Sequence, residues 1–210
     1  MNARSKARFV YDKMGELYPD AGCELNFRNE LELLVSIMLS QQATDLSVNR
    51  LTTSLFQKYQ KIEDYAKATE TEMQNDIKTI GLYRNKAKNL IAMSKEVIAR
   101  YEGIIPKNRE LLEELPGIGR KTAGVFLAEW MHEPHFPVDT HVKRVSWRLG
   151  FSKEKDDPDK VEAKLEKLYD PSEWITAHHR FLFFGRYHCT ARNPRCKECV
   201  LIKECKHPLL

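Results

Sequence analysis

Apolar side chains recur every three or four residues along most of the chain, which is the period of an amphipathic α-helix. The clearest examples are Leu31, Leu34, Val35, Met38 and Leu39, and nearer the N-terminus Phe9, Val10, Met14 and Leu17. No segment alternates apolar and polar residues over the length of a strand, and no Asn-Gly or Asp-Gly hairpin dipeptide occurs. The pattern therefore predicts an all-α protein.

Capping residues predict where individual helices begin and end. Helices are expected to begin at Thr44, at Thr69 and at Asp170, and a longer one to span residues 84–101. At Thr69 and at Asp170 a Glu three residues later completes a capping box. The helix from Thr69 should reach about Ile80, and the helix from Asp170 should run toward Cys189. The stretch Pro134–Pro137 is expected to connect two helical layers.

Positive charge is concentrated in two places, although the formal net charge is only +4. The segment from His178 to His207 contains Arg180, Arg186, Arg192, Arg195, Lys197, Lys203 and Lys206 against two acids. A second basic group is formed by Arg84, Lys86 and Lys88. Such clusters are typical of phosphate contacts, but a solvated helix face would look the same.

The chain lacks the sequence features of a membrane or secreted protein. No apolar run approaches the roughly 20 residues that a membrane-spanning helix requires. Charged residues interrupt the N-terminal segment, which excludes a signal peptide. We therefore expect a cytoplasmic protein whose five cysteines are thiols or metal ligands.

The segment Leu115–Ala123 contains two glycines two residues apart, between a short helix (about 109–114) and a longer one (about 119–131). Gly117 and Gly119 allow a sharp turn and leave the backbone amides unobstructed. The free amides and the positive dipole end of the second helix would bind a DNA phosphate. Arg120 and Lys121 directly after the turn favour this interpretation over a purely structural turn. The pattern is a helix–hairpin–helix motif, which indicates DNA binding without fixing a reaction.

Lys121 is expected in the first turn of the second helix, where the helix dipole and partial burial would lower the pKa of its amine. An amine that loses its proton readily can attack an electrophilic sugar carbon. The second helix rises about 18 Å, and the extended residues 131–137 could return over that length, so Asp139 can lie beside Lys121. The alternatives are a phosphate contact for Lys121 and a helix N-cap for Asp139.

Four cysteines lie within 17 residues in the pattern C-x6-C-x2-C-x5-C: Cys189, Cys196, Cys199 and Cys205. Such a group in a reducing compartment predicts a metal site. Structural zinc usually uses paired short knuckles, and four thiolates on an irregular loop can hold a 4Fe–4S cluster. Spacing alone leaves both metals open. The fifth cysteine, Cys23, is expected to be a small buried apolar residue.

Taken together, these segments resemble the endonuclease III family of helix–hairpin–helix DNA glycosylase/AP lyases over essentially the full length. The resemblance rests on residues 39–45 (Leu-Ser-Gln-Gln-Ala-Thr-Asp), 80–83 (Ile-Gly-Leu-Tyr), 115–123, 138–141 (Val-Asp-Thr-His) and the four cysteines. It implies two helical lobes with a DNA cleft between them. A six-helix barrel would span residues 22–131, with the helix–hairpin–helix at about 109–131, and an iron–sulfur lobe would combine 1–21 with 132–210.

The resemblance also implies a role for each site residue. Lys121 would be the nucleophile and Asp139 the essential carboxylate, while the four cysteines hold a 4Fe–4S cluster. The DNA-binding residues would be Gln42, Leu82, Gly117, Gly119, Arg120 and His141. Of these, Gln42 and Leu82 would enter the duplex, with Gln41 as the alternative to Gln42. The partner would be double-stranded DNA with oxidised pyrimidines or abasic sites, bound by a monomer at the bacterial nucleoid.

Two other functions fit part of the pattern. An adenine-type glycosylase of the same superfamily would share the cluster, but it usually has another residue in place of Lys121 and an added C-terminal domain. A non-catalytic DNA-binding module with structural zinc would use the hairpin and the cysteines but would leave Lys121 and Asp139 without a role.

Metal content separates the enzyme from the zinc module. The purified protein is expected to be yellow-brown and to contain iron, because the four cysteines would bind an iron–sulfur cluster. Elemental analysis and the visible absorption spectrum measure this. A colourless protein with one zinc ion per chain would support the non-catalytic module instead.

Overall fold

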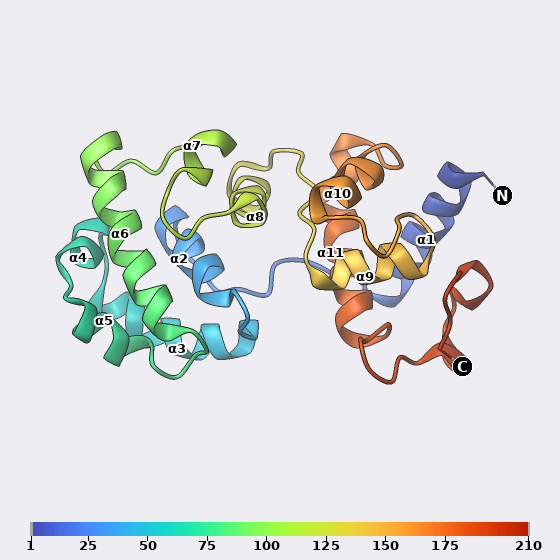
Figure 1. Ribbon diagram of the computed structural model, residues 1–210, viewed down its shortest axis with the longest axis horizontal. Coiled ribbons are helices and arrows are strands. Elements are labelled where there is room, and N and C mark those ends of the chain that lie inside the picture. Colours follow the sequence, from blue (N-terminus) through green and yellow to red (C-terminus); the bar gives the residue numbers. More distant parts are fainter. Residues whose placement is uncertain (1, 210) are drawn as a thin grey trace. The chain divides into compact units, whose positions relative to one another are not determined.

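The computed structural model describes residues 2–209 and divides into two compact units. The inner unit comprises Glu24–Glu133, and the terminal unit comprises Met1–Cys23 with Pro134–Leu210. Every regular element among the described residues is a helix (Figure 1), so the all-α prediction is confirmed. None of the described helices is long and apolar enough to cross a lipid bilayer.

The inner unit is built around one helix that is buried on all sides. Its helices are α2 (Glu30–Ser40), α3 (Asp45–Lys58), α4 (Ile62–Lys67), α5 (Glu70–Ile77), α6 (Tyr83–Tyr101), α7 (Arg109–Glu113) and α8 (Arg120–Met131). Every residue of α2 from Glu32 to Leu39 is buried. This helix packs against α3, α6 and α8 (Figure 1). A helix without a polar face belongs in the centre of a core, and α2 occupies that place.

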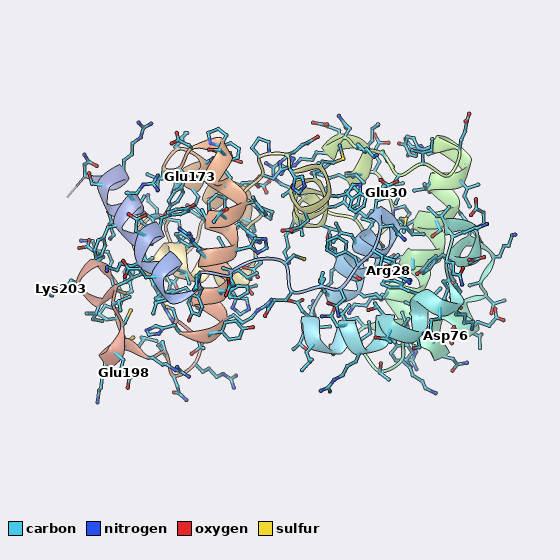
Figure 2. All side chains as sticks on the ribbon, turned by 180° about the vertical axis from the view of Figure 1, so that it is seen from behind. Arg28, Glu30, Asp76, Glu173, Glu198 and Lys203 are labelled. Atoms are coloured by element: carbon cyan, nitrogen blue, oxygen red, sulfur yellow. The ribbon has the colours of Figure 1, made fainter. Side chains whose placement is uncertain are left out.

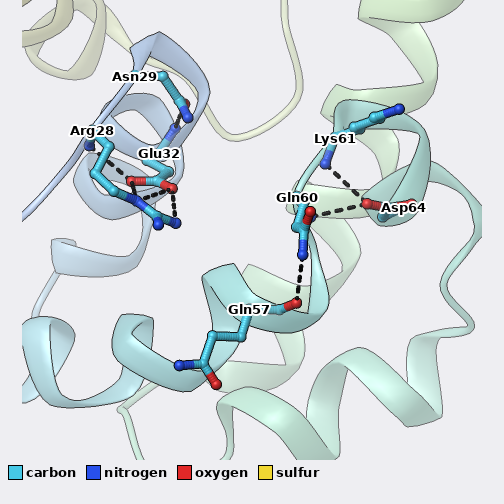
Figure 3. Close-up of polar contacts among 7 residues, drawn as sticks. All are labelled: Arg28, Asn29, Glu32, Gln57, Gln60, Lys61 and Asp64. Atoms are coloured by element: carbon cyan, nitrogen blue, oxygen red, sulfur yellow. Dashed lines mark hydrogen bonds and ion pairs between the residues drawn. The ribbon is translucent and has the colours of Figure 1, made fainter.

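The beginning of α2 is held by polar contacts at the edge of this core (Figure 3). The Asn29 side chain accepts a hydrogen bond from the Glu32 amide at 2.9 Å, as an N-cap does. The Glu32 carboxylate is buried, and it accepts hydrogen bonds from the Arg28 backbone amide (2.8 Å) and guanidinium (2.6 Å). These partners satisfy a charge that would otherwise be costly to bury.

The terminal unit combines the first helix of the chain with its C-terminal half. Its elements are α1 (Ala3–Leu17), α9 (Thr140–Arg148), α10 (Pro158–Glu166), η1 (Pro171–Glu173), α11 (Trp174–Tyr187), η2 (Cys196–Glu198) and η3 (Ile202–Glu204). The central helix α11 packs against both α9 and α1. Phe136, Phe181 and Phe184 on and around it are fully buried and form the middle of this second core.

The predicted helix starts agree with the structure, while two boundaries differ. Thr44 caps α3, and Thr69 forms the predicted capping box of α5. Helix α5 ends at Ile77 rather than near Ile80, because the chain turns there and the Ile80 amide bonds to the Ile77 carbonyl. After Asp170, the capping box opens one turn of 3-10 helix before α11 begins at Trp174.

Lys86 does not belong to an exposed basic group, contrary to the sequence-based expectation. Arg84 and Lys88 are exposed, but Lys86 is buried, and its Nζ donates to the Leu39 carbonyl at 2.8 Å. That carbonyl lies in the last turn of α2, where carbonyl oxygens lack helical partners and the dipole is negative. Burial lowers the pKa of the Lys86 amine below its ordinary value. Lys86 therefore joins α6 to the end of α2.

Replacing Lys86 with methionine should lower the free energy of unfolding by roughly 1–3 kcal/mol at pH 7, because it leaves a buried carbonyl without its donor. The folded-state pKa of Lys86 lies below 10.5, so the unfolded chain binds more protons between those two values. The stability advantage of the native chain over Lys86→Met should therefore grow as the pH rises toward 10.5. Urea denaturation from pH 7 to 10 measures both chains, with the exposed Lys88→Met as control. An advantage that shrinks with pH would contradict this assignment.

Candidate active site

The turn between α7 and α8 has a buried base and an open tip. Leu115 and Ile118 are buried, and the Ile118 amide donates to the Leu115 carbonyl at 3.1 Å. These two apolar side chains anchor the hairpin to the inner core. Gly119 and Arg120, directly after Ile118, are exposed at the tip of the turn.

The two glycines of the hairpin have different tasks. Gly117 has a φ of +80°, and a Cβ there would lie 2.7 Å from the Cβ of Asn89, so both conformation and packing require glycine. Gly119 has extended backbone with a φ of −103° and no atom within 4 Å of an added Cβ. It serves as the N-cap of α8 and leaves the space in front of the first helical turn open.

The first turn of α8 fits an anion. No side chain caps this helix, so its first amides have no helical partner and point outward with the positive end of the dipole. Lys121, at the second position of α8, is exposed, and the expectation of partial burial for this amine is wrong. Arg120 beside it is exposed as well. Two cations and a helix start without a capping side chain therefore lie together on an exposed edge.

Two further loops of the inner unit present side chains at left-handed positions. Gln42 has a φ of 54° and is exposed; Leu82 has a φ of 59° and remains 51% exposed. Residues other than glycine rarely adopt this backbone conformation, and an exposed leucine side chain does not contribute to the packing of the core. The two loops are neighbours, since a Cβ on Gly81 would lie 3.7 Å from the Gln42 carbonyl oxygen.

In the terminal unit, Asp139 is the N-cap of α9. Its Oδ1 accepts a hydrogen bond from the Val142 amide at 2.8 Å, which confirms the capping interpretation. The residue is partly exposed, so its carboxylate can also face a substrate. His141 is the second residue of the helix, and its Nδ1 lies 3.2 Å from the Arg144 guanidinium.

Two arginines of α9 hold the segment that carries the cysteines. Arg144 donates to the carbonyls of Gly185 (2.7 Å) and Cys189 (3.1 Å), and burial lowers the pKa of its guanidinium. Arg148 donates to the Thr190 carbonyl at 2.8 Å and reaches the Cys189 Sγ at 3.3 Å. Sequence reasoning missed both residues. The available signal was their spacing of four on the short helix that follows Asp139.

The four cysteines of the predicted metal site line one cavity. Cys189, Cys196, Cys199 and Cys205 all contribute to its wall. Burial raises the pKa of the Cys199 and Cys205 thiols. Within residues 2–209 no three His, Cys, Asp or Glu side chains are arranged as a metal site. Four cysteine sulfurs around one pocket nevertheless form the soft donor set that binds zinc or an iron–sulfur cluster.

The basic residues near these cysteines divide into structural and exposed ones. Arg180 is half-buried, packs over the Tyr11 ring at 3.9 Å and donates to the Tyr11 carbonyl, so its side chain joins α11 to α1. The exposed basic residues are Arg192, Arg195, Lys197, Lys203 and Lys206. Figure 2 shows Lys203 and Glu198 on this segment. The segment thus retains a positive surface of five side chains.

Comparisons with known proteins agree with this geometry. The family model described as HhH-GPD superfamily base excision DNA repair protein matches residues 35–171. An endonuclease III of Bacillus subtilis (strain 168) is 50% identical over 94% of this chain and 90% of its own. This chain belongs to the endonuclease III family. The Escherichia coli (strain K12) member is 37% identical over 97% of this chain and 96% of its own.

A solved endonuclease III trapped in a covalent intermediate with DNA has the same fold. It matches with a TM-score of 0.95 and 45% identity, covering 98% of this chain and 97% of that one. As a member of the endonuclease III family, the chain is a base-excision repair enzyme with DNA glycosylase and AP lyase activity. Membership disfavours both the adenine-type glycosylase and the non-catalytic zinc module.

Proposed function

We propose that this enzyme removes oxidised pyrimidines from double-stranded DNA and cleaves the abasic strand through a Schiff base on Lys121. The observation that carries the proposal is an exposed amine in the first turn of a helix whose amides no side chain caps. An anion site places a DNA phosphate next to the amine that would attack the sugar. The enzyme would work as a monomer on the chromosome in the cytoplasm.

The proposed reaction depends on the Lys121 amine acting as the nucleophile. A base within the stack cannot be attacked at its sugar, so the damaged nucleotide is first turned out of the duplex. The Lys121 nitrogen bonds to C1′ and the glycosidic bond breaks, with its electron pair leaving on the base, which takes up a proton. Opening of the sugar gives a protonated imine. Loss of a C2′ proton then moves electrons toward C3′ and expels the 3′ phosphate, and water releases the amine.

Asp139 supports these steps as a carboxylate. It would stabilise positive charge that develops on the sugar and accept or return protons during base loss and elimination. The hydrogen bond from the Val142 amide holds one of its oxygens, so the orientation of the carboxylate is set by the start of α9. The other oxygen remains available to the substrate.

Gln42 and Leu82 would fill the space that the extruded nucleotide leaves. Inserted side chains offset part of the cost of unstacking. We assign the role to Gln42 rather than to Gln41, because the Gln41 amide already donates to the Gly117 carbonyl at 3.0 Å. Gly117, Gly119 and Arg120 would hold a phosphate at the hairpin, and His141 would contact another at the start of α9.

Cys189, Cys196, Cys199 and Cys205 would hold a 4Fe–4S cluster in the cavity that they line. When bound, the cluster supplies a crosslink among four points of an irregular segment. Arg148 is positioned to donate to the sulfur of the first ligand. The exposed basic residues of the segment would then be held in a fixed arrangement for phosphate contacts.

Borohydride reduction on a duplex with thymine glycol should trap wild-type protein covalently on DNA, because reduction fixes the imine. Lys121→Gln removes the amine and should abolish the adduct while the protein still binds the duplex. Denaturing electrophoresis measures the adduct, and Lys95→Gln, an exposed lysine on α6, serves as the matched control. An undiminished adduct in Lys121→Gln would place the nucleophile elsewhere.

Asp139→Asn should lower turnover by roughly 10²–10⁴-fold while leaving DNA affinity and helix capping in place. Asparagine caps helices as well as aspartate does, so the Val142 amide keeps its acceptor and only the charge is lost. Single-turnover rates and binding to the same duplex measure the two effects. Normal single-turnover chemistry with strongly weakened binding would refute the role assigned to this carboxylate.

A further inference from the structure

The side chain of Gln41 connects two loops that are far apart in sequence. Gln41 follows the last residue of α2, and its Nε2 donates to the Gly117 carbonyl at 3.0 Å. The same nitrogen lies 3.3 Å from the Thr122 Oγ1 in the first turn of α8. Gly117 and Thr122 flank the hairpin's anion site. One amide therefore ties the α2–α3 loop to the phosphate-binding turn.

The loop tied in this way carries the residue proposed to enter the duplex. Gln42 comes directly after Gln41 and holds a left-handed backbone conformation. Such a conformation persists in a non-glycine residue only when its surroundings enforce it. The Ala43 amide donates to the Ser40 carbonyl at 3.0 Å across this turn, and the Gln41 hydrogen bond and the Gly81 backbone lie on either side of it.

Helix α6 supplies the remaining contacts among these loops. Lys86 and Asn89 lie three positions apart on one face of α6, and Leu82 is the N-cap residue directly before its first turn. Lys86 bonds to the Leu39 carbonyl at the end of α2, and the Asn89 side chain packs against Gly117. α6 thus contacts both the end of α2 and the hairpin turn. The Gln41 hydrogen bond connects the end of α2 directly to the hairpin turn, so each of these three segments contacts the other two.

We propose that Gln41 is a positioning residue that holds Gln42 and Leu82 in register with the hairpin. The inference rests on the proposed function, in which these residues enter the duplex while the hairpin holds a phosphate. Successive bases of one strand are only about 3.4 Å apart, so the inserted side chains must be placed accurately relative to that phosphate. Loops that moved independently would have to be ordered on binding, and pre-formed loops avoid that cost.

The test uses Gln41→Met, which keeps the side-chain length and removes the donor. The substrate is a duplex with a tetrahydrofuran abasic analogue, which the enzyme cannot cleave, and 2-aminopurine beside it. The dissociation constant of the protein for this duplex should rise about three- to tenfold, which corresponds to the net free energy of one hydrogen bond. At saturating protein, the rise in 2-aminopurine fluorescence should be smaller than for wild type, because the side chains insert less completely.

The matched control is Gln60→Met. Gln60 lies in the same unit, and its Nε2 donates to the Gln57 carbonyl at 3.2 Å (Figure 3), so the chemical change is the same. This variant should bind and fluoresce as wild type does. A Gln41→Met protein that also matches wild type in both measurements would overturn the positioning role.

A double-mutant cycle separates positioning from a local packing effect. If Gln41 acts through the inserted side chains, the penalty of Gln41→Met should shrink in a Leu82→Ala background. A penalty of equal size in both backgrounds would mean that Gln41 does not act through Leu82, and would overturn the inference. Binding to the analogue needs no catalysis, so wild-type protein that binds it but forms no borohydride adduct on the thymine glycol duplex would refute only the proposed chemistry.

Discussion

At Gly117 the backbone turns through a left-handed conformation against the side chain of Asn89, and α8 begins three residues later without a capping side chain. This arrangement is possible because Leu115 and Ile118 hold the base of the turn in the inner core. It places free amides, Arg120 and Lys121 on one exposed edge. Both the phosphate site and the proposed nucleophile depend on it.

The rest of the inner unit keeps this edge in place. The apolar helix α2 is buried on all sides, so its C-terminal end is fixed by the core rather than by solvent-facing contacts. Lys86 bonds to that end from α6, and Gln41 extends from it to the hairpin. The loops that carry Gln42 and Leu82 are therefore joined to the hairpin turn through short, specific contacts.

Helix α9 has a similar function in the terminal unit. Asp139 caps its first turn, while Arg144 and Arg148 on its later turns hold the carbonyls of residues 185–190. The Lys206 amide donates to the Arg148 carbonyl at 2.7 Å, so the C-terminal segment is attached to the same helix. One rigid element of nine residues thus carries the proposed acid–base group and the support of the cysteine segment.

The sequence by itself determined the all-α class, most helix starts, the hairpin and the four-cysteine segment. These features are local: a capping box, a pair of glycines or closely spaced thiols acts through neighbouring residues and can be seen in a short stretch of sequence. The tertiary structure alone decided which polar side chains face inward. Lys86 and Arg180 look like surface charges in sequence, yet one bonds to the end of α2 and the other packs over Tyr11. The Gln41 side chain has a hydrogen-bond partner 76 residues away in the sequence. No local pattern distinguishes it from Gln42 on that ground, because no local pattern encodes a contact at that separation.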